Sequence, residues 1–463
     1  MSKGKYVGEK PTNYIRIGTQ YYKITNVPLL SGDVLTNLTK WNKETILIDH
    51  DDKFLIKIPT YDNHCIIPEH KDYKQVIGNS YNKYEPFAHK ATPGNCEKSK
   101  EFVKHIFGDQ FEKGYDYLKV LYEKPFRKLP ILCLVSSSRR TGKTTFLNWL
   151  KEIFKGNMTL NTESDFRSQF NSDWATKLII AIDEAMLNRQ EDSEKLKNLS
   201  TSKHYKMEAK NVERLEIPFF GKFIICSNKE TDFVKIDNEE VRYWVRKIPV
   251  LADRNDDLLK ELVSEIPAFL HFLENREFTT KGTDRSWFHP EEIETEALLK
   301  LKHGNRSTLE LEIITIIKEI LEDFDLTEVR YTLSDLMELL RQSGGIRNLS
   351  KRKISEVLSN SFGLEQTHNS KYTHVSKDSS GEMLMNPRSG RYYEFTYDMF
   401  FDKFVKKSVK TYLMGYESII NKIDDVTFLE ALKNECNTEY GLKLSCSEFK
   451  HIVLELNDMP LCS

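Results

Sequence analysis

The sequence predicts an α/β protein with a parallel sheet at its centre, a small α+β region before it and a winged-helix-like region after it. Three short apolar runs end abruptly in polar residues, as buried parallel strands do: Ile131–Val135, Lys177–Ile182 and Lys222–Cys226. A polar loop and an amphipathic helix over Thr144–Phe154 follow the first run. Strand, loop and helix in this order are typical of an α/β core, whose ligands bind at the carboxyl ends of the strands.

The composition excludes several classes of protein. A length of 463 residues suggests two to four domains, and 39% hydrophobic residues are too many for a wholly disordered chain. A net charge of −2 excludes a polybasic coat protein, although a basic groove can lie within a neutral chain. The seven cysteines form no CxxC pair, which argues against a zinc knuckle and fits a reducing cytoplasm. No apolar run is long enough for a membrane span, so we expect a cytoplasmic location.

The chain divides into five parts by pattern. The segments 98–125 and 256–275 have helical spacing and enclose the expected strands, whereas Tyr21–Ile24, Thr45–Ile48 and Phe54–Ile58 resemble short strands. The predicted parts are an N-terminal α+β region (1–95), the α/β core (96–275), a linker (276–304), a winged-helix-like domain (305–400) and a C-terminal helical region (401–463).

The winged-helix prediction depends on the order of elements after residue 305. Leu309–Phe324, Leu333–Leu340 and Ser350–Leu358 have helical spacing, and the strand-like Tyr372–Val375 and Arg391–Phe395 then flank a polar stretch. This order predicts three helices followed by a two-stranded ribbon. Three cations crowd the start of the third helix, where they would contact DNA phosphates: Lys351, Arg352 and Lys353. A protein-docking surface or a solvated helix end would give the same pattern.

The loop after the first strand nearly matches the phosphate-binding pattern G-x-x-x-x-G-K-[ST]. Gly142, Lys143 and Thr144 match, and Ser137 stands where the first glycine is expected. Backbone N–H groups would cradle phosphates, Lys143 would reach the β- and γ-phosphates of ATP, and the Thr144 hydroxyl would ligate Mg²⁺. The alternative is a helix start with a surface lysine. The predicted nucleotide-binding residues are Ser137, Ser138, Arg139, Arg140, Thr141, Gly142, Lys143, Thr144 and Thr145.

Polar residues at the ends of the next two strands complete a candidate catalytic set. Asp183 would hold Mg²⁺, and Glu184 would act as a general base toward the attacking water. Asn228 would hydrogen-bond both the γ-phosphate and that water, because its amide contains a donor and an acceptor. Each feature alone has an ordinary alternative. Asp183 and Glu184 would be two acidic side chains in solvent at a strand end, and Asn228 would be a turn residue.

Two arginines follow shortly after Asn228. Arg242 and Arg246 are four residues apart and would share a face if this segment were helical. Phosphoryl transfer is helped by an arginine that neutralises charge on the γ-phosphate, often supplied by a neighbouring subunit. We expect Arg242 in this role, with Arg246 as the second candidate. A surface arginine paired with Glu239 or Glu240 is the alternative.

These motifs, in this order, resemble superfamily 3 helicases, a branch of the AAA+ ATPases. More narrowly, about residues 80–275 resemble the helicase portion of phage and mobile-element primase-helicases, in the segments Tyr81–Pro86, Leu129–Pro130, Phe233–Asp237 and Arg242–Lys247. The resemblance implies an AAA+ P-loop core that uses ATP and Mg²⁺. It also implies single-stranded DNA as a partner and a homo-oligomeric ring, hexameric in that family.

The family also has a DNA-contacting hairpin between the acidic motif and the third strand. The matching positions here carry cations, which would track phosphates, and Tyr205, which would offer a stacking face. A solvated charged loop is the alternative. The expected DNA contacts in this hairpin are Lys203, His204, Lys206 and Lys210.

The sequence therefore predicts an ATP-dependent, ring-forming helicase that moves on single-stranded DNA. It would serve replication of a phage, plasmid or mobile element in a bacterial host, with any primase or polymerase as a separate chain. The triplet Asp49–Asp51 resembles a primase metal pair, but the region 1–95 is too short for that domain, so we expect a polar turn. Two alternatives stay open: a packaging-type DNA-translocating ATPase, and a nucleotide-gated initiator or loader that does not unwind DNA. A defence role for the same motor also fits.

Overall fold

The computed structural model describes residues 12–28, 34–208, 214–237, 239–344, 349–378, 380–401, 403–413, 425–442 and 444–458. The chain divides into two compact units. The first contains Met1–Leu187, Glu194–Asn228 and Arg242–Ile293, and the second contains Asn188–Ser193, Lys229–Val241 and Glu294–Ser463. Within the described ranges, no helix combines the length and apolar character that a membrane span needs.

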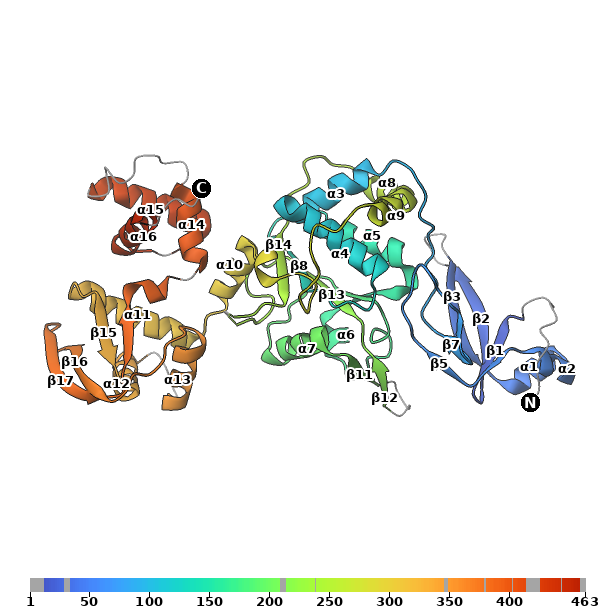
Figure 1. Ribbon diagram of the computed structural model, residues 1–463, viewed down its shortest axis with the longest axis horizontal. Coiled ribbons are helices and arrows are strands. Elements are labelled where there is room, and N and C mark those ends of the chain that lie inside the picture. The colour runs from blue at the N-terminus through green and yellow to red at the C-terminus, as the bar shows by residue number, and fades with distance from the viewer. Residues whose placement is uncertain are drawn as a thin grey trace. The chain divides into compact units, whose positions relative to one another are not determined.

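A five-stranded parallel sheet forms the centre of the first unit (Figure 1). Its strands are β8 (Ile131–Val135), β9 (Met158–Asn161), β10 (Ile179–Ile182), β13 (Lys222–Ser227) and β14 (Tyr243–Lys247), in the spatial order β14-β8-β13-β10-β9. All neighbouring pairs are parallel. Every residue of β8, β10 and β13 is buried, as expected for a parallel sheet covered on both faces. The predicted parallel sheet is confirmed.

Helices from before and after the sheet share one hydrophobic core with it. They are α3 (Glu97–Phe107), α4 (Phe111–Glu123), α5 (Lys143–Phe154), α8 (Leu258–Ser264) and α9 (Ile266–Asn275). The helical pattern predicted over 98–125 is two helices, because the chain turns at Gly108 with φ +52°. A Cβ atom there would lie 2.5 Å from the Arg246 guanidinium, so glycine alone fits.

Between β9 and β13 the chain adds two helices and a hairpin. The helices are α6 (Glu163–Arg167) and α7 (Gln190–Thr201), and the antiparallel hairpin consists of β11 (His204–Met207) and β12 (Leu215–Pro218). The hairpin thus emerges from the segment between the strands that end in Asp183 and Asn228.

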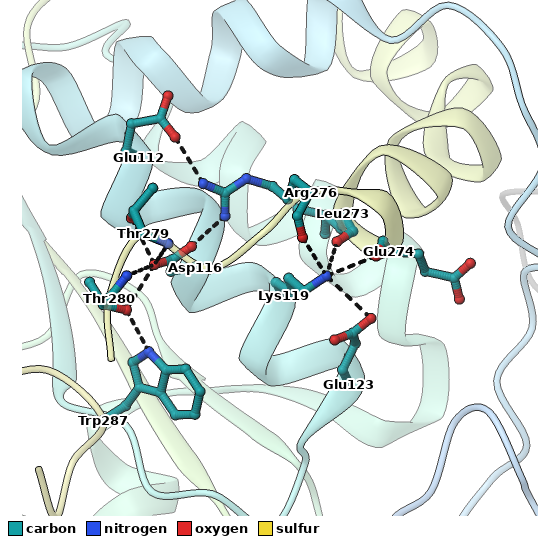
Figure 2. A network of polar contacts seen from close by, with 10 residues as sticks. All are labelled: Glu112, Asp116, Lys119, Glu123, Leu273, Glu274, Arg276, Thr279, Thr280 and Trp287. Atoms are coloured by element: carbon teal, nitrogen blue, oxygen red, sulfur yellow. Dashed lines mark hydrogen bonds and ion pairs between the residues drawn. The ribbon is translucent and has the colours of Figure 1, made fainter. Parts of the chain in front are cut away.

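A buried polar network joins α4 to the segment after α9 (Figure 2). The fully buried Asp116 carboxylate accepts hydrogen bonds from Arg276 and from the backbone and hydroxyl groups of Thr279 and Thr280. Lys119 donates to the carbonyl groups of Leu273, Glu274 and Arg276. The first part of the predicted linker is therefore bonded to the core, and the first unit extends to Ile293.

The N-terminal region contains two small sheets and two short helices. One sheet has the order β3-β2-β1-β4, from β1 (Tyr14–Ile17), β2 (Gln20–Pro28), β3 (Val34–Trp41) and β4 (Thr60–Tyr61). The other has the order β5-β7-β6, from β5 (Asn63–Cys65), β6 (Val76–Ile77) and β7 (Ser80–Asn82). The helices are α1 (Lys43–Asp49) and α2 (Asp52–Lys57).

The strands predicted at Thr45–Ile48 and Phe54–Ile58 are wrong, because helices occupy both positions. Asn42 and Asp51 begin these helices by accepting hydrogen bonds from the backbone N–H groups of Glu44 and Phe54. Asp51 is thus a helix N-cap and does not lie in the polar turn that was expected at Asp49–Asp51.

Two hydrophobic cores lie among the described residues of the second unit. The first combines α11 (Thr308–Asp323), β15 (Glu328–Tyr331), α12 (Leu333–Gln342), α13 (Lys351–Asn360), β16 (Ser370–Lys377) and β18 (Tyr393–Thr396). The second combines α10 (Glu296–Gly304), α14 (Lys403–Leu413), α15 (Val426–Tyr440) and α16 (Cys446–Asp458).

The three helices expected from the winged-helix pattern are present, but the strands pair differently. The ribbon consists of β16 and β17 (Met383–Gly390), and β18 pairs with β15 instead. The stretch read as a polar loop therefore contains a strand. Because every residue from Met383 to Ser389 is exposed, it lacks the alternating apolar pattern that would have revealed it.

Candidate nucleotide site

The loop from Ser136 to Gly142 connects β8 to α5. Gly142 caps α5 with φ +86°, and Arg140 also has a positive φ of 59°. Two contacts from outside fix the loop: His105 Nε2 hydrogen-bonds the Thr141 carbonyl at 2.9 Å, and the Leu251 N–H donates to the Arg140 carbonyl at 3.0 Å. Residues 137–140 remain exposed, so the loop presents an open surface at the start of the helix.

Ser137, at the position of the missing glycine, is not among the described residues with a positive φ. Left-handed backbone is needed at Arg140 and Gly142 instead. The serine therefore causes no left-handed strain in this loop, which removes the conformational objection to the motif.

Lys143 connects the ends of two strands. Its ammonium group donates to the Ser136 carbonyl at 3.0 Å and to Asn228 Oδ1 at 3.1 Å. This contact is possible because β8 and β13 are direct neighbours in the sheet, so Ser136 and Asn228 leave the same edge side by side. The side chain is buried among these groups, and its charge lies at the base of the phosphate loop.

Asp183 and Glu184 follow β10, on the other side of β13. The Thr144 hydroxyl lies 3.5 Å from Asp183 Oδ2, so the two expected metal ligands face each other. Glu184 is exposed and has φ +50°, a conformation that non-glycine residues adopt rarely and that is common at functional sites. The structure therefore brings Lys143, Thr144, Asp183 and Asn228 together at one edge of the sheet.

The donor set suits Mg²⁺ more than a protein-caged metal. Among the described residues, no three His, Cys, Asp or Glu side chains form a metal-binding group. Mg²⁺ usually takes one or two carboxylates and completes its shell with waters and substrate phosphates. One carboxylate and one hydroxyl, from Asp183 and Thr144, fit that requirement. Burial and then the Asp183 charge raise the pKa of the nearby Cys226 thiol well above the usual value.

Arg246 lies on a strand and Arg242 directly before it, and not on the helix that was expected. Arg246 belongs to β14 and is buried, and its guanidinium donates to Asp109 at 2.9 Å and Gln110 at 3.1 Å. Arg242 directly precedes β14, at the opposite end of the sheet from the phosphate loop. Five residues at about 3.3 Å each separate these ends by roughly 16 Å, so Arg242 does not reach its own nucleotide site.

The candidate DNA hairpin presents cations on its outer side. Lys203, His204 and Lys206 are exposed, and Lys210 lies outside the described residues. Tyr205 is not a free stacking face, because its ring stacks on Trp174 with a centroid distance of 5.7 Å and meets Phe219 edge-on. This aromatic contact anchors the base of the hairpin.

Asn171 also holds the hairpin. Its side chain donates to the Lys206 carbonyl at 3.2 Å and accepts from the Glu208 N–H at 2.9 Å. Asn171 was not predictable from the sequence, because a lone asparagine in a polar stretch gives no signal.

The second unit has a polar cleft at the start of α13. Lys351, Arg388 and Arg391 line it together with hydroxyl groups of Ser334 and Tyr372. Arg388 is held by the buried Asp335 carboxylate. Of the other two predicted cations, Arg352 is paired with Glu356 at 2.8 Å, and Lys353 is exposed beyond the cap. Arg388 was missed because it lies in the stretch interpreted as a loop, and Arg391 because the segment that it begins was interpreted only as a strand.

Comparisons with known proteins show the fold. A family model described as "Family of unknown function (DUF5906)" matches residues 134–246, and comparison with curated proteins gave no match. The apo NrS-1 C-terminal region (305–718) has a TM-score of 0.55 at 16% identity, over 82% of this chain and 95% of that one. Its A form gives 0.50 at 19% identity, over 76% and 84%.

A third similar structure is a JCV helicase, with a TM-score of 0.26 at 12% identity, over 48% of this chain and 64% of that one. This likeness is too low to carry an argument. The chain thus shares the fold of the NrS-1 C-terminal region over most of its length, with an α/β core of P-loop type.

Proposed function

We propose that the protein is an ATP-driven helicase of superfamily 3 type that assembles as a ring on single-stranded DNA. The observation that carries this proposal is the junction of Lys143, Asn228, Thr144 and Asp183 at one edge of the parallel sheet. A lysine at a helix start, a hydroxyl beside a carboxylate and an amide are the groups that phosphoryl transfer uses. The helicase resemblance in the motif order supports the same reading.

Each residue has a defined part in hydrolysis. The loop 137–145 would bind the triphosphate through its backbone N–H groups, and Lys143 would neutralise the β- and γ-phosphate oxygens. Thr144 and Asp183 would hold Mg²⁺, which would draw charge from those oxygens when bound. Glu184 would accept a proton from the attacking water while the water oxygen forms a bond to the γ-phosphorus. The bond between the γ-phosphorus and the bridging oxygen would break, and ADP would leave. Asn228 would orient that water.

The arginine for this reaction would come from a neighbouring copy. Arg242 lies at the far end of its own sheet, whereas Arg246 is bonded within its own subunit. A site that needs the Arg242 guanidinium therefore needs a second chain, as in a ring. Hexameric stoichiometry comes from the family resemblance alone.

The DNA would contact two cationic surfaces. Lys203, His204 and Lys206 on the hairpin would follow the single strand, and Lys351–Lys353 with the neighbouring cleft would bind phosphates at the second unit. Replication of a phage, plasmid or other mobile element in the host cytoplasm is the proposed setting, with a separate primase or polymerase as partner.

ATP hydrolysis and strand displacement on a forked DNA test this function. We expect Lys143→Ala and Asp183→Asn each to lower hydrolysis at least about 100-fold, because each removes a group that stabilises transferring charge. The matched control is Lys260→Ala, an exposed lysine of α8 in the same unit. Unwinding that persists in both site variants would contradict the assignment. Hydrolysis without fork separation would favour a packaging-type motor, and nucleotide binding without hydrolysis would favour an initiator or loader.

A further inference from the structure

The N-terminal sheet has two faces with different surroundings. Side chains on one face include Tyr14, whose ring meets His50 and Phe54 edge-on, so α1 and α2 cover this side. The register places Tyr22 between Ile15 and Lys40 in one row across the opposite face. Ile15 is buried, whereas Tyr22 is half-buried and Lys40 is exposed. The outer half of this face is therefore open.

One further cation, Lys83, reaches this open half from the segment directly after β7. The Lys83 ammonium lies 5.5 Å from the centre of the Tyr22 ring. Burial and then the nearby Lys40 charge lower the pKa of Lys83, and burial and then Lys83 lower the pKa of His64. We call Tyr22, Lys40, His64 and Lys83 the Tyr22 face.

The cations of the Tyr22 face lack acidic partners. Within the described residues, neither Lys40 nor Lys83 forms an ion pair, although short-range ion pairs hold many other lysines of this unit. Two like charges held close together disfavour each other until an anion approaches. The neighbouring Tyr61 and Tyr81 rings, with centroids 5.3 Å apart, continue the aromatic surface along the sheet.

Uncompensated cations beside aromatic rings are the combination that single-strand binders use. The cations attract the phosphates, and the ring offers a platform for an unpaired base. In a duplex the base faces are covered by stacking, so a duplex would contact only the lysines. An acidic peptide would likewise gain nothing from the ring.

We propose that the Tyr22 face binds single-stranded DNA, outside the ATPase core. This inference rests on the proposed function only in taking single-stranded DNA as the substrate. It gives the N-terminal region a role as a second contact for the strand, separate from the β11–β12 hairpin.

Binding of a labelled oligothymidylate to the full chain without nucleotide tests the cations. We expect the double variant Lys40→Met/Lys83→Met to lower the slope of log Kd against log salt concentration by about 1.4, since each single-strand phosphate contact contributes about 0.7. The control is Lys43→Met/Lys53→Met, which removes the same charge from exposed positions on α1 and α2. Equal slopes for the two double variants would overturn the proposal.

Photocrosslinking with bromodeoxyuridine tests the ring. We expect a crosslinked peptide that contains Tyr22, and Tyr22→Leu should weaken binding about tenfold, within the range of one base stack. Thermal unfolding checks that Tyr22→Leu still folds. If this variant does not fold, the crosslinked peptides of the wild-type protein show whether DNA contacts Tyr22. Crosslinks confined to other segments, or competition by polyglutamate as strong as by DNA, would reject a single-strand site.

The outcomes separate this inference from the proposed helicase. If the chain never hydrolyses ATP but crosslinks at Tyr22, the Tyr22 face stands and the helicase proposal fails. If the chain unwinds forks but the Tyr22 peptide stays free of DNA, the inference alone fails.

Discussion

Oxygen atoms of its own chain hold the Lys143 ammonium in position. Ser136 and Asn228 supply two oxygen atoms at 3.0 and 3.1 Å, so the ammonium is fixed at the base of the loop. A group that is already in place needs no reorganisation when negative charge develops. Incoming phosphate oxygens would compete with Asn228 for the same ammonium, which would couple nucleotide binding to the orientation of the Asn228 amide.

The buried His70 should make stability depend on pH. Burial lowers its pKa from 6.5 to about 4, against smaller raising effects of the Tyr122 carbonyl and Glu69. The unfolded chain therefore binds the proton more tightly, and stability present above pH 6.5 is lost as pH falls toward 4. The expected loss is about 3 kcal/mol.

Unfolding midpoints measured between pH 7 and 4.5 test the His70 effect. His70→Gln should flatten this part of the curve relative to wild type. The exposed His204→Gln is the control and should leave it unchanged. A His70→Gln curve parallel to that of wild type would show that other groups cause the acid sensitivity.

The meeting of the candidate site residues at one edge of the sheet was predictable from the sequence because their signals are local. Lys143, Asp183 and Asn228 each follow directly after a continuous apolar strand or its loop, and parallel strands bring such ends to one edge. Arg388, Arg391 and Asn171 were not predictable, because their neighbours are fixed by distant pairing. The role of Tyr205 was misread for a similar reason, since Trp174 and Phe219 cover its ring.

At the scale of elements, two segments have a secondary structure other than the one that their local sequence pattern predicts. Ile46, Ile48 and Phe54 favour strands by residue type, but Asn42 and Asp51 cap helices there, and Ile48 is 84% exposed. The segment after Arg242 was read as helical from arginine spacing, yet Tyr243, Trp244 and Val245 are fully buried in an edge strand. The three short buried strands β8, β10 and β13 were predicted correctly, whereas β9 and β14 of the same sheet were not.

The Asp116 network should contribute strongly to the stability of the first unit. Arg276→Met removes the cation from a fully buried carboxylate and leaves only hydroxyl and amide donors. Breaking a buried pair in this way costs about 3 kcal/mol or more. The control Arg254→Met removes a pair whose side chains are 72% and 79% exposed, which should cost less than about 1 kcal/mol.

Denaturant unfolding followed by tryptophan fluorescence measures both arginine variants. Trp287 donates to Thr280 inside the network, so this region contributes one of the five tryptophans to the signal. Equal effects of Arg276→Met and Arg254→Met would mean that the network adds no more than a surface pair.

At the scale of the whole molecule, Arg242 and the phosphate loop lie at opposite ends of the paired strands β14 and β8. This placement predicts complementation between two inactive variants. Lys143→Ala and Arg242→Ala should each be inactive, because one lacks the phosphate lysine and the other lacks the supplied arginine. A mixture of equal amounts should regain about a quarter of wild-type hydrolysis, since random assembly joins an intact loop to an intact arginine at that fraction of interfaces.

Hydrolysis by such mixtures, assembled before DNA is added, tests this prediction. The control mixes Lys143→Ala with a copy that carries both substitutions, and this mixture should stay inactive. If the mixture of Lys143→Ala and Arg242→Ala hydrolyses ATP no faster than the sum of the two variants alone, Arg242 acts within its own subunit or takes no part in the reaction.

If Arg242 completes the site of a neighbouring copy, as proposed, its placement opposite the phosphate loop also limits which assemblies can be fully active. Copies that join head to tail in an open string leave a terminal member whose pocket never receives a guanidinium. Only a closed circle provides one donor for every acceptor. Hydrolysis per chain should therefore rise in a step when the ring closes. In an open or interrupted ring, one nucleotide site would lack its arginine and stay inactive.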